Sequence, residues 1–214
     1  MNICIGIISY LPDDSSDRNV RLSRLHSLLI KCDSIFKKDI VIIAQNWHDV
    51  TLPKLHHTNI TIYKYPNKLG ITGARIKLRE KFLASNYDYL IMLDDDADVK
   101  GTELDGLLYL QQIEAHPGMY GVFKELLLKF FAISKEMYSK IEFPKLEAEK
   151  GEIFEDMYLI MALNKKYPDK KYVFKRNGLD DISNSGSDKY STWYRRQYNK
   201  RQIGDKTRAM IRNL

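Results

Sequence analysis

The sequence predicts an α/β fold with a mostly parallel central sheet flanked by helices. Three segments, residues 3–9, 39–44 and 89–93, are rich in Ile, Val and Leu and show little alternation, which is typical of strands buried on both faces. Helical patterns lie between strands, as the right-handed crossovers of a parallel sheet require. A length of 214 residues and a hydrophobic content of 44% allow one full hydrophobic core.

The predicted elements follow the order β-α-β-β-α-β up to residue 93. A helix is expected over residues 18–32, a third strand over 59–65 and a second helix over 72–85. Apolar residues of the first helix recur at helical spacing on one face: Leu22, Leu25, Leu29 and Cys32. The remaining expected elements are a helix over 102–115, strands over 118–122 and 130–133, a helix capped by Ser134, a helix within 152–163 and a strand over 170–174.

The cysteines and the hydropathy pattern favour a cytoplasmic protein. Cys4 lies in the first strand and Cys32 on an apolar helix face, so both are predicted to be core thiols rather than a disulfide framework. No stretch approaches the roughly 20 apolar residues that a membrane span needs. Residues 1–8 lack the basic start of a signal peptide and are expected to open the first strand. The sequence carries no signal for an oligomeric state.

A run of acids follows the 89–93 strand: Asp94, Asp95, Asp96 and Asp98. It emerges at the carboxyl end of a buried strand, which is where open α/β sheets bind their ligands. Carboxylates this close repel one another, and a bound Mg²⁺ or Mn²⁺ would remove that conflict. In an extended chain Asp94, Asp96 and Asp98 would point the same way. The alternative is a solvated acidic turn.

The net charge of +6 is unevenly placed along the chain. Residues 165–214 contain 14 Lys and Arg against 5 Asp and Glu, a net charge of +9. The remainder of the chain therefore carries a net charge of −3. From residue 189 onward, aromatic residues are interleaved with bases, which suits stacking on nucleobases combined with phosphate contacts.

Four motifs resemble the GT-A-fold glycosyltransferases, especially the family 2-like inverting members, over about residues 3–175. They are a first strand ending in Ser9-Tyr10, the segment Asn67-Lys68-Leu69-Gly70 with Gly73-Ala74-Arg75, the Asp-x-Asp-type Asp94-Asp95-Asp96, and Glu155-Asp156. Their order and spacing together are more specific than any one of them. The resemblance implies a GT-A (Rossmann-like) domain over residues 1–175. Residues 176–214 would then form a basic, aromatic extension packed on or near the active site.

The resemblance implies metal-dependent, inverting transfer of a sugar from a nucleotide-diphosphate sugar, with UDP-sugars favoured, to a hydroxyl group. Asp96 would hold Mn²⁺ or Mg²⁺, and the ion would neutralise the departing diphosphate. Asp94 would contact the ribose or share the metal, and Asp98 is a rival ligand. The other donor-binding residues implied are Ser9 and Tyr10 at the nucleobase, and Asn67, Gly70, Gly73, Arg75 and Asp95. The alternatives are a packed turn aromatic for Tyr10 and a solvated helix residue for Arg75.

Inversion requires one general base that takes the proton of the acceptor hydroxyl. The resemblance assigns this role to Asp156, with Glu155 orienting it or binding the acceptor. The alternative is an acidic pair that complements a helix dipole.

The chain departs from the family pattern in two places. Residues 44–49 replace an Asp-Asp-Gly-Ser-like segment that reads the nucleotide, so Asp49 or a stacking Trp47 would take over that task. No histidine follows His116 to serve as a late metal ligand. Asp180, Asp181, Asn184 or water would have to replace it.

The basic extension makes a hydroxymethylated base in DNA the leading acceptor. Small phage-type glycosyltransferases that modify such bases are similar in size and layout, and they must reach a base inside a duplex. The acceptor contacts would come from Lys189, Trp193, Tyr194, Arg195 and Arg196. A glycan, or a glycolipid at an anionic membrane, is the alternative acceptor.

Two other classes of protein remain open. A haloacid-dehalogenase-like phosphatase could use Asp96-Ala97-Asp98-Val99, although that motif normally follows the first strand of its fold. A non-catalytic nucleic-acid-binding module would explain the basic extension but would leave the acidic run and Glu155-Asp156 without a purpose.

Overall fold

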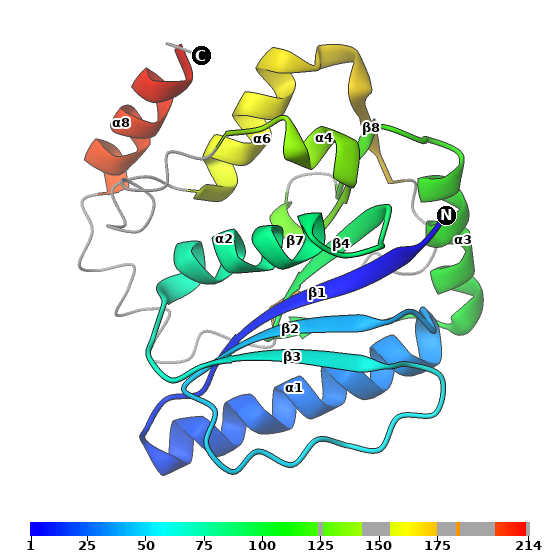
Figure 1. The fold of residues 1–214 in the computed structure, drawn as a ribbon, viewed down its shortest axis with the longest axis vertical. Coiled ribbons are helices and arrows are strands. Elements are labelled where there is room, and N and C mark those ends of the chain that lie inside the picture. Colours follow the sequence, from blue (N-terminus) through cyan, green and yellow to red (C-terminus); the bar gives the residue numbers. More distant parts are fainter. Residues whose placement is uncertain (124–125, 143–154, 175–182, 185–199, 213–214) are drawn as a thin grey trace.

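A computed structural model of the chain describes residues 1–123, 126–142, 155–174, 183–184 and 200–212. Its main sheet has the strand order β3-β2-β1-β4-β7-β6-β8 (Figure 1). The strands of that sheet are β1 (Ile3–Tyr10), β2 (Ile40–Gln45), β3 (Ile60–Tyr65), β4 (Tyr89–Asp94), β6 (Tyr120–Phe123), β7 (Leu126–Ser134) and β8 (Lys171–Val173). A second, two-stranded sheet pairs β5 (Ala97–Asp98) with β9 (Ser183–Asn184).

Four neighbouring strands of the main sheet, β3, β2, β1 and β4, are parallel. Strand β7 runs antiparallel to both β4 and β6, and β8 is parallel to β6. The predicted α/β fold with a mostly parallel sheet is therefore confirmed. In the register between β1 and β4, Ile8 lies opposite Asp94, so Ser9 and Tyr10 reach the level of the acidic run.

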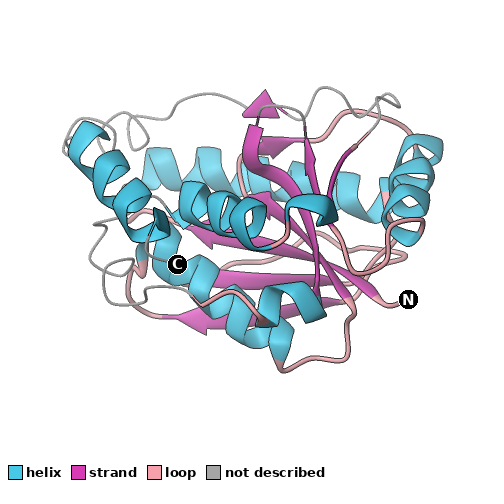
Figure 2. Ribbon diagram, turned by 90° about the horizontal axis from the view of Figure 1, so that it is seen from above, coloured by secondary structure: helices cyan, strands magenta, loops and turns pink. Residues whose placement is uncertain are grey.

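Helices cover both faces of the sheet, as Figure 2 shows from above. The helices are α1 (Ser15–Ile35), α2 (Gly70–Leu83), α3 (Glu103–Glu114), α4 (Lys135–Ser139), α6 (Glu155–Lys166) and α8 (Lys200–Arg212), with a short 3₁₀ helix at Pro168–Lys170. Ile5 of β1 belongs to the core under α1 and α3, whereas Cys4 belongs to the core under α2, α4 and α6. Successive side chains of a strand point to opposite faces, so β1 is buried on both, as its unbroken apolar run predicted.

Helix α1 begins three residues before the predicted start, because Asp14 caps it. The Asp14 carboxylate accepts hydrogen bonds from the backbone amides of Ser16 and Asp17. Cys4 and Cys32 are buried free thiols, which confirms their assignment to the core. Burial raises the pKa of each thiol to about 12, so both stay protonated at neutral pH. Among the described residues, no helix is both long and apolar enough to span a membrane.

A buried carboxylate ties the loop between β2 and β3 to helix α1. Asp33 is 6% exposed and accepts the backbone amides of His56 at 3.0 Å and His57 at 2.8 Å. Burial opposes ionisation of Asp33, but these amides outweigh it and hold the pKa of the carboxyl below its ordinary value. The ionised form therefore stabilises the fold, and this contribution is lost as the pH falls through the lowered pKa.

Replacing Asp33 with Asn should lower the free energy of unfolding at pH 7 by about 1–3 kcal/mol, because buried amides lose their charged acceptor. Urea unfolding at pH 7, 5 and 3 measures this change. Wild-type stability should fall between pH 5 and pH 3, and the variant should lose less over that interval. Glu114→Gln, at an exposed position of α3, is the control. Equal losses in D33N and wild type would contradict the role of this carboxylate.

Candidate active site

The acidic run lies where β1 and β4 end side by side at the carboxyl edge of the sheet. Asp94 is the last residue of β4, residues 95–96 form a turn, and Ala97–Asp98 form β5. The expectation that Asp94, Asp96 and Asp98 point the same way along an extended chain is therefore wrong, because the chain turns between them. The run nevertheless occupies the edge at which parallel sheets bind ligands.

Asp94 is held by Arg75 of helix α2. An Nη2 atom of Arg75 lies 2.9 Å from Oδ1 of Asp94, and the Arg75 side chain is only 10% exposed. Arg75 is thus a buried ion-pair partner of the acidic run and not a solvated helix residue. A planar guanidinium suits this task because it can donate several hydrogen bonds to carboxylate or phosphate oxygens.

Asp98 is directed toward the opposite face of the sheet. The Lys31 amine of helix α1 lies 2.5 Å from Oδ1 of Asp98. Because α1 and α2 cover different faces, the charges of Asp94 and Asp98 are balanced by bases on opposite sides. This arrangement separates Asp98 from the pair formed by Asp94 and Arg75.

Asp95 is buried between the end of β1 and helix α1. Its Oδ2 accepts the backbone amide of Tyr10 at 3.4 Å, and its Oδ1 lies 3.6 Å from Nη1 of Arg21. Burial raises the pKa of Asp95 to about 6, the positive charge of Arg21 lowers it, and the nearby Asp96 raises it. Asp95 therefore supports the backbone of Ser9-Tyr10, and Ser9 is itself only 1% exposed.

Three loops converge beside the acidic run, those that follow β1, β2 and β3. Lys68 places its amine 4.7 Å from the centre of the Tyr10 ring, which is half-buried. The Gln45 side chain donates to the Ser9 carbonyl at 3.5 Å and accepts the Leu69 amide at 2.7 Å. Gln45 thus connects the ends of β1 and β2 with the loop that follows β3. Sequence reasoning missed this role, because a lone Gln at the end of a strand carries no distinguishing signal.

The loop around Gly70 shows why glycine is required there. Gly70 begins α2 with a φ of 72°, in the left-handed region that glycine adopts without strain. A Cβ at Gly73 would come within 3.2 Å of Leu69 Cβ, so the first turn of α2 is closely packed. Asn67, in the same loop, is exposed to solvent.

The suggestion that Trp47 stacks on a nucleobase is wrong. Trp47 is 6% exposed and packs in the core beneath α1. The side chain of the preceding Asn46 is also used within the chain, since it donates to the Leu11 carbonyl and to Asp13, each at 2.8 Å. Asp49 is exposed in the same loop.

The acids assigned to acceptor activation lie at the start of the described part of α6. Glu155 and Asp156 are its first two residues, so the predicted helical context holds for their backbone. Among the alternatives for a late metal ligand, Asn184 lies in β9, where its backbone pairs with Ala97 directly after the acidic turn. Asp180 and Asp181 fall outside the described residues, and so do the five expected acceptor residues, Lys189, Trp193, Tyr194, Arg195 and Arg196.

Within the described residues, no three His, Cys, Asp or Glu side chains come together as a metal-binding cluster. The residue types at the edge of β4 still fit a hard divalent cation, because Asp94 ends the strand and Asp96 lies in the turn that follows it. Mg²⁺ is commonly held by one or two carboxylates together with substrate phosphates, and such a site needs no cluster of three protein ligands.

The strand order and the helical layers agree with the GT-A fold that solved structures of nucleotide-sugar transferases share. Comparison with models of protein families and with curated protein sequences finds no match. Solved structures do match. S. aureus TarS 1-349 superposes with a TM-score of 0.55 at 14% identity over 83% of this chain. This chain spans only 59% of the length of that TarS fragment.

Two further solved structures were determined with nucleotides bound. TarS 1-349 in complex with UDP-GlcNAc has a TM-score of 0.52 at 14% identity and covers 91% of this chain and 64% of its own. Glucosyl-3-phosphoglycerate synthase from Mycobacterium tuberculosis, in complex with Mn²⁺, UDP and phosphoglyceric acid, has a TM-score of 0.53 at 12% identity. It covers 82% of this chain and 71% of its own. At these identities the likeness establishes the fold alone.

Proposed function

We propose that this chain is a glycosyltransferase that moves a sugar from a nucleotide-diphosphate sugar, in the first place a UDP-sugar, to a hydroxyl acceptor. The observation that carries the proposal is the acidic turn at the carboxyl edge of β4, held by Arg75 and flanked by Tyr10 and Lys68, on a GT-A fold. The bound UDP-GlcNAc of TarS and the UDP of the mycobacterial synthase support this choice of donor.

The donor nucleotide is proposed to lie across the loops that follow β1 and β3. Tyr10 offers an aromatic ring at the end of β1. Lys68 supplies positive charge beside that ring, and Arg75 supplies it at Asp94. The exposed Asn67 and the close backbone of Gly70 and Gly73 would complete the contacts to the donor.

Mn²⁺ or Mg²⁺ is proposed to be held by Asp96 together with Asp94. Asp98 is the weaker candidate, since it pairs with Lys31 toward the other face of the sheet. When bound, such an ion supplies positive charge for the diphosphate as it leaves. The Mn²⁺ of the mycobacterial synthase supports a metal-dependent site on this fold.

Asp156 is proposed as the general base of an inverting displacement, with Glu155 orienting it or binding the acceptor. The acceptor oxygen forms a bond to the anomeric carbon from one side while the bond to the diphosphate oxygen breaks on the other. The hydroxyl proton passes to the Asp156 carboxylate. The place of Asp156 at the described start of α6 supports this role.

The acceptor is proposed to be a hydroxymethylated base in DNA, on the strength of the eight bases and single acid in residues 189–214. A salt-sensitive gel shift with duplex DNA, lost when residues 189–214 are deleted, would support it. No shift at low salt would contradict a DNA acceptor and would favour a glycan or glycolipid.

A thermal-shift screen of nucleotide-diphosphate sugars with Mn²⁺ tests the proposed donor. At a hundredfold excess over Kd, a true donor should raise the melting temperature by about 5 °C or more. Transfer to candidate acceptors is then assayed with that donor. A flat response to every nucleotide sugar would overturn the proposed function.

A further inference from the structure

Helix α2 carries a second arginine, Arg79, one turn beyond Arg75. The Arg79 guanidinium donates to the backbone carbonyl of Tyr138 at 3.2 and 3.0 Å, of Ser139 at 3.4 Å and of Ile141 at 2.8 Å. The same guanidinium lies 5.3 Å from the centre of the Tyr138 ring. Arg79 therefore fixes the C-terminal end of α4 and the residues that follow it against α2.

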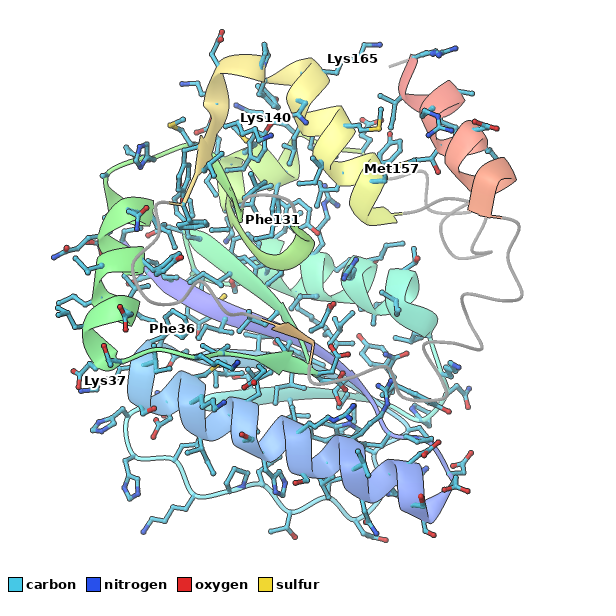
Figure 3. All side chains as sticks on the ribbon, turned by 180° about the vertical axis from the view of Figure 1, so that it is seen from behind. Phe36, Lys37, Phe131, Lys140, Met157 and Lys165 are labelled. Atoms are coloured by element: carbon cyan, nitrogen blue, oxygen red, sulfur yellow. The ribbon has the colours of Figure 1, made fainter. Side chains whose placement is uncertain are left out.

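The segment that Arg79 holds is also bonded to helix α6. The Tyr158 hydroxyl, two residues after Asp156, donates to the Glu142 carbonyl at 3.1 Å, and Tyr158 is 3% exposed. Near the other end of α6, the Lys166 amine donates to the Lys140 carbonyl at 2.8 Å. Figure 3 labels Met157 at the beginning of this helix and Lys165 toward its end. Helix α6 is thus tied to residues 140–142 near both of its ends.

Residues four apart on a helix lie on one face, so Arg75 and Arg79 share a face of α2. Arg75 holds Asp94, on the side where the donor is proposed to bind. Arg79 holds the segment after α4 whose carbonyl groups accept hydrogen bonds from α6. We infer that Arg79 is a positioning residue that sets the helix carrying Asp156 against the acidic run. This inference rests on the proposed function, because it assigns Asp156 to proton transfer.

Only an arginine can make this set of contacts from one position. Its planar fork reaches three carbonyls at once, whereas a lysine offers one compact ammonium. The carbonyls at a helix end carry partial negative charge, which strengthens the bonds. A displacement of α6 by about 1 Å would be enough to slow the reaction by about 100-fold.

The test compares Arg79→Ala and Arg79→Lys with Lys77→Ala. Lys77 lies on the same helix and pairs with Glu80 at 2.8 Å, so its removal deletes one positive charge and an ion pair within α2. Two properties are measured on the full chain. The first is the kcat and KM for hydrolysis of UDP-glucose with Mn²⁺. The second is hydrogen exchange at residues 159–162, whose helical amides bond to the first turn of α6.

R79A is expected to lower kcat by about 10- to 100-fold while KM for UDP-glucose changes less than about twofold. In R79A, hydrogen exchange at residues 159–162 should accelerate selectively. R79K should recover only part of the kcat and of the slow exchange. K77A should match wild type in both. If residues 159–162 exchange in R79A as slowly as in wild type, the positioning role of Arg79 is overturned. The same holds if hydrogen exchange accelerates uniformly over the whole chain. A flat thermal-shift response of the wild-type protein to every nucleotide sugar would instead overturn the proposed function, and the exchange comparison would still decide whether Arg79 holds α6.

Discussion

Asp156→Asn is expected to abolish sugar transfer while leaving donor binding nearly intact. Asparagine keeps the size of the side chain but cannot accept the proton of the acceptor hydroxyl. Loss of a general base costs about 10²- to 10⁴-fold in rate, and the variant should show that loss in kcat. Single-turnover transfer from a labelled nucleotide sugar measures the rate, and calorimetry with UDP and Mn²⁺ measures donor binding.

Glu155→Gln is the matched comparison, because it removes the neighbouring negative charge from the same helical turn. If the two acids only complemented the dipole of α6, both variants would lose stability to a similar, small extent and keep their activity. Full activity in D156N would end the assignment of this residue as the base.

Asp96→Ala is expected to remove the metal-dependent part of UDP binding. Asp96 is the residue proposed to hold the ion, and alanine removes its carboxylate without replacing it. The loss should therefore exceed about tenfold in Kd, or about 1.4 kcal/mol, when calorimetry is performed with Mn²⁺. Without metal, wild type and D96A should bind UDP equally weakly.

Asp98→Asn distinguishes the two possible Asp-x-Asp pairs of the run. The ion pair with Lys31 on the far side of the sheet predicts that D98N affects metal-dependent binding less than D96A does. Asp169→Asn, in the exposed 3₁₀ helix, controls for the loss of one acid. Mn²⁺-enhanced binding that persists in D96A but disappears in D98N would reassign the metal site.

The buried strands could be predicted from the sequence because a strand that is buried on both faces consists almost entirely of apolar residues. Ile3–Tyr10 and Tyr89–Asp94 are apolar almost throughout, and both lie between helical layers. The placement of β7 antiparallel between β4 and β6 could not be predicted, since a run such as Leu126–Ser134 has the same composition in either direction. The pairing of β9 with β5 joins segments more than 80 residues apart, and no local pattern specifies it.

The sequence could name candidate residue types for the site but not their geometry. The acids of the run were identified from their clustering after a buried strand. The directions of their side chains could not be predicted, because the turn at residues 95–96 contains no glycine or proline that would indicate a turn. The bases that hold them, such as Arg21 and Lys31 on α1, lie 74 and 67 residues away and look like ordinary polar positions of an amphipathic helix. Their roles follow only from the packing of α1 on the sheet.

A crystal structure of this protein soaked with Mn²⁺ and UDP tests the central claim most directly. The proposed function predicts metal density against the Asp96 carboxylate, the diphosphate bound to that metal, and the base beside Tyr10. Metal and nucleotide bound away from the edge formed by β1 and β4 would contradict the account.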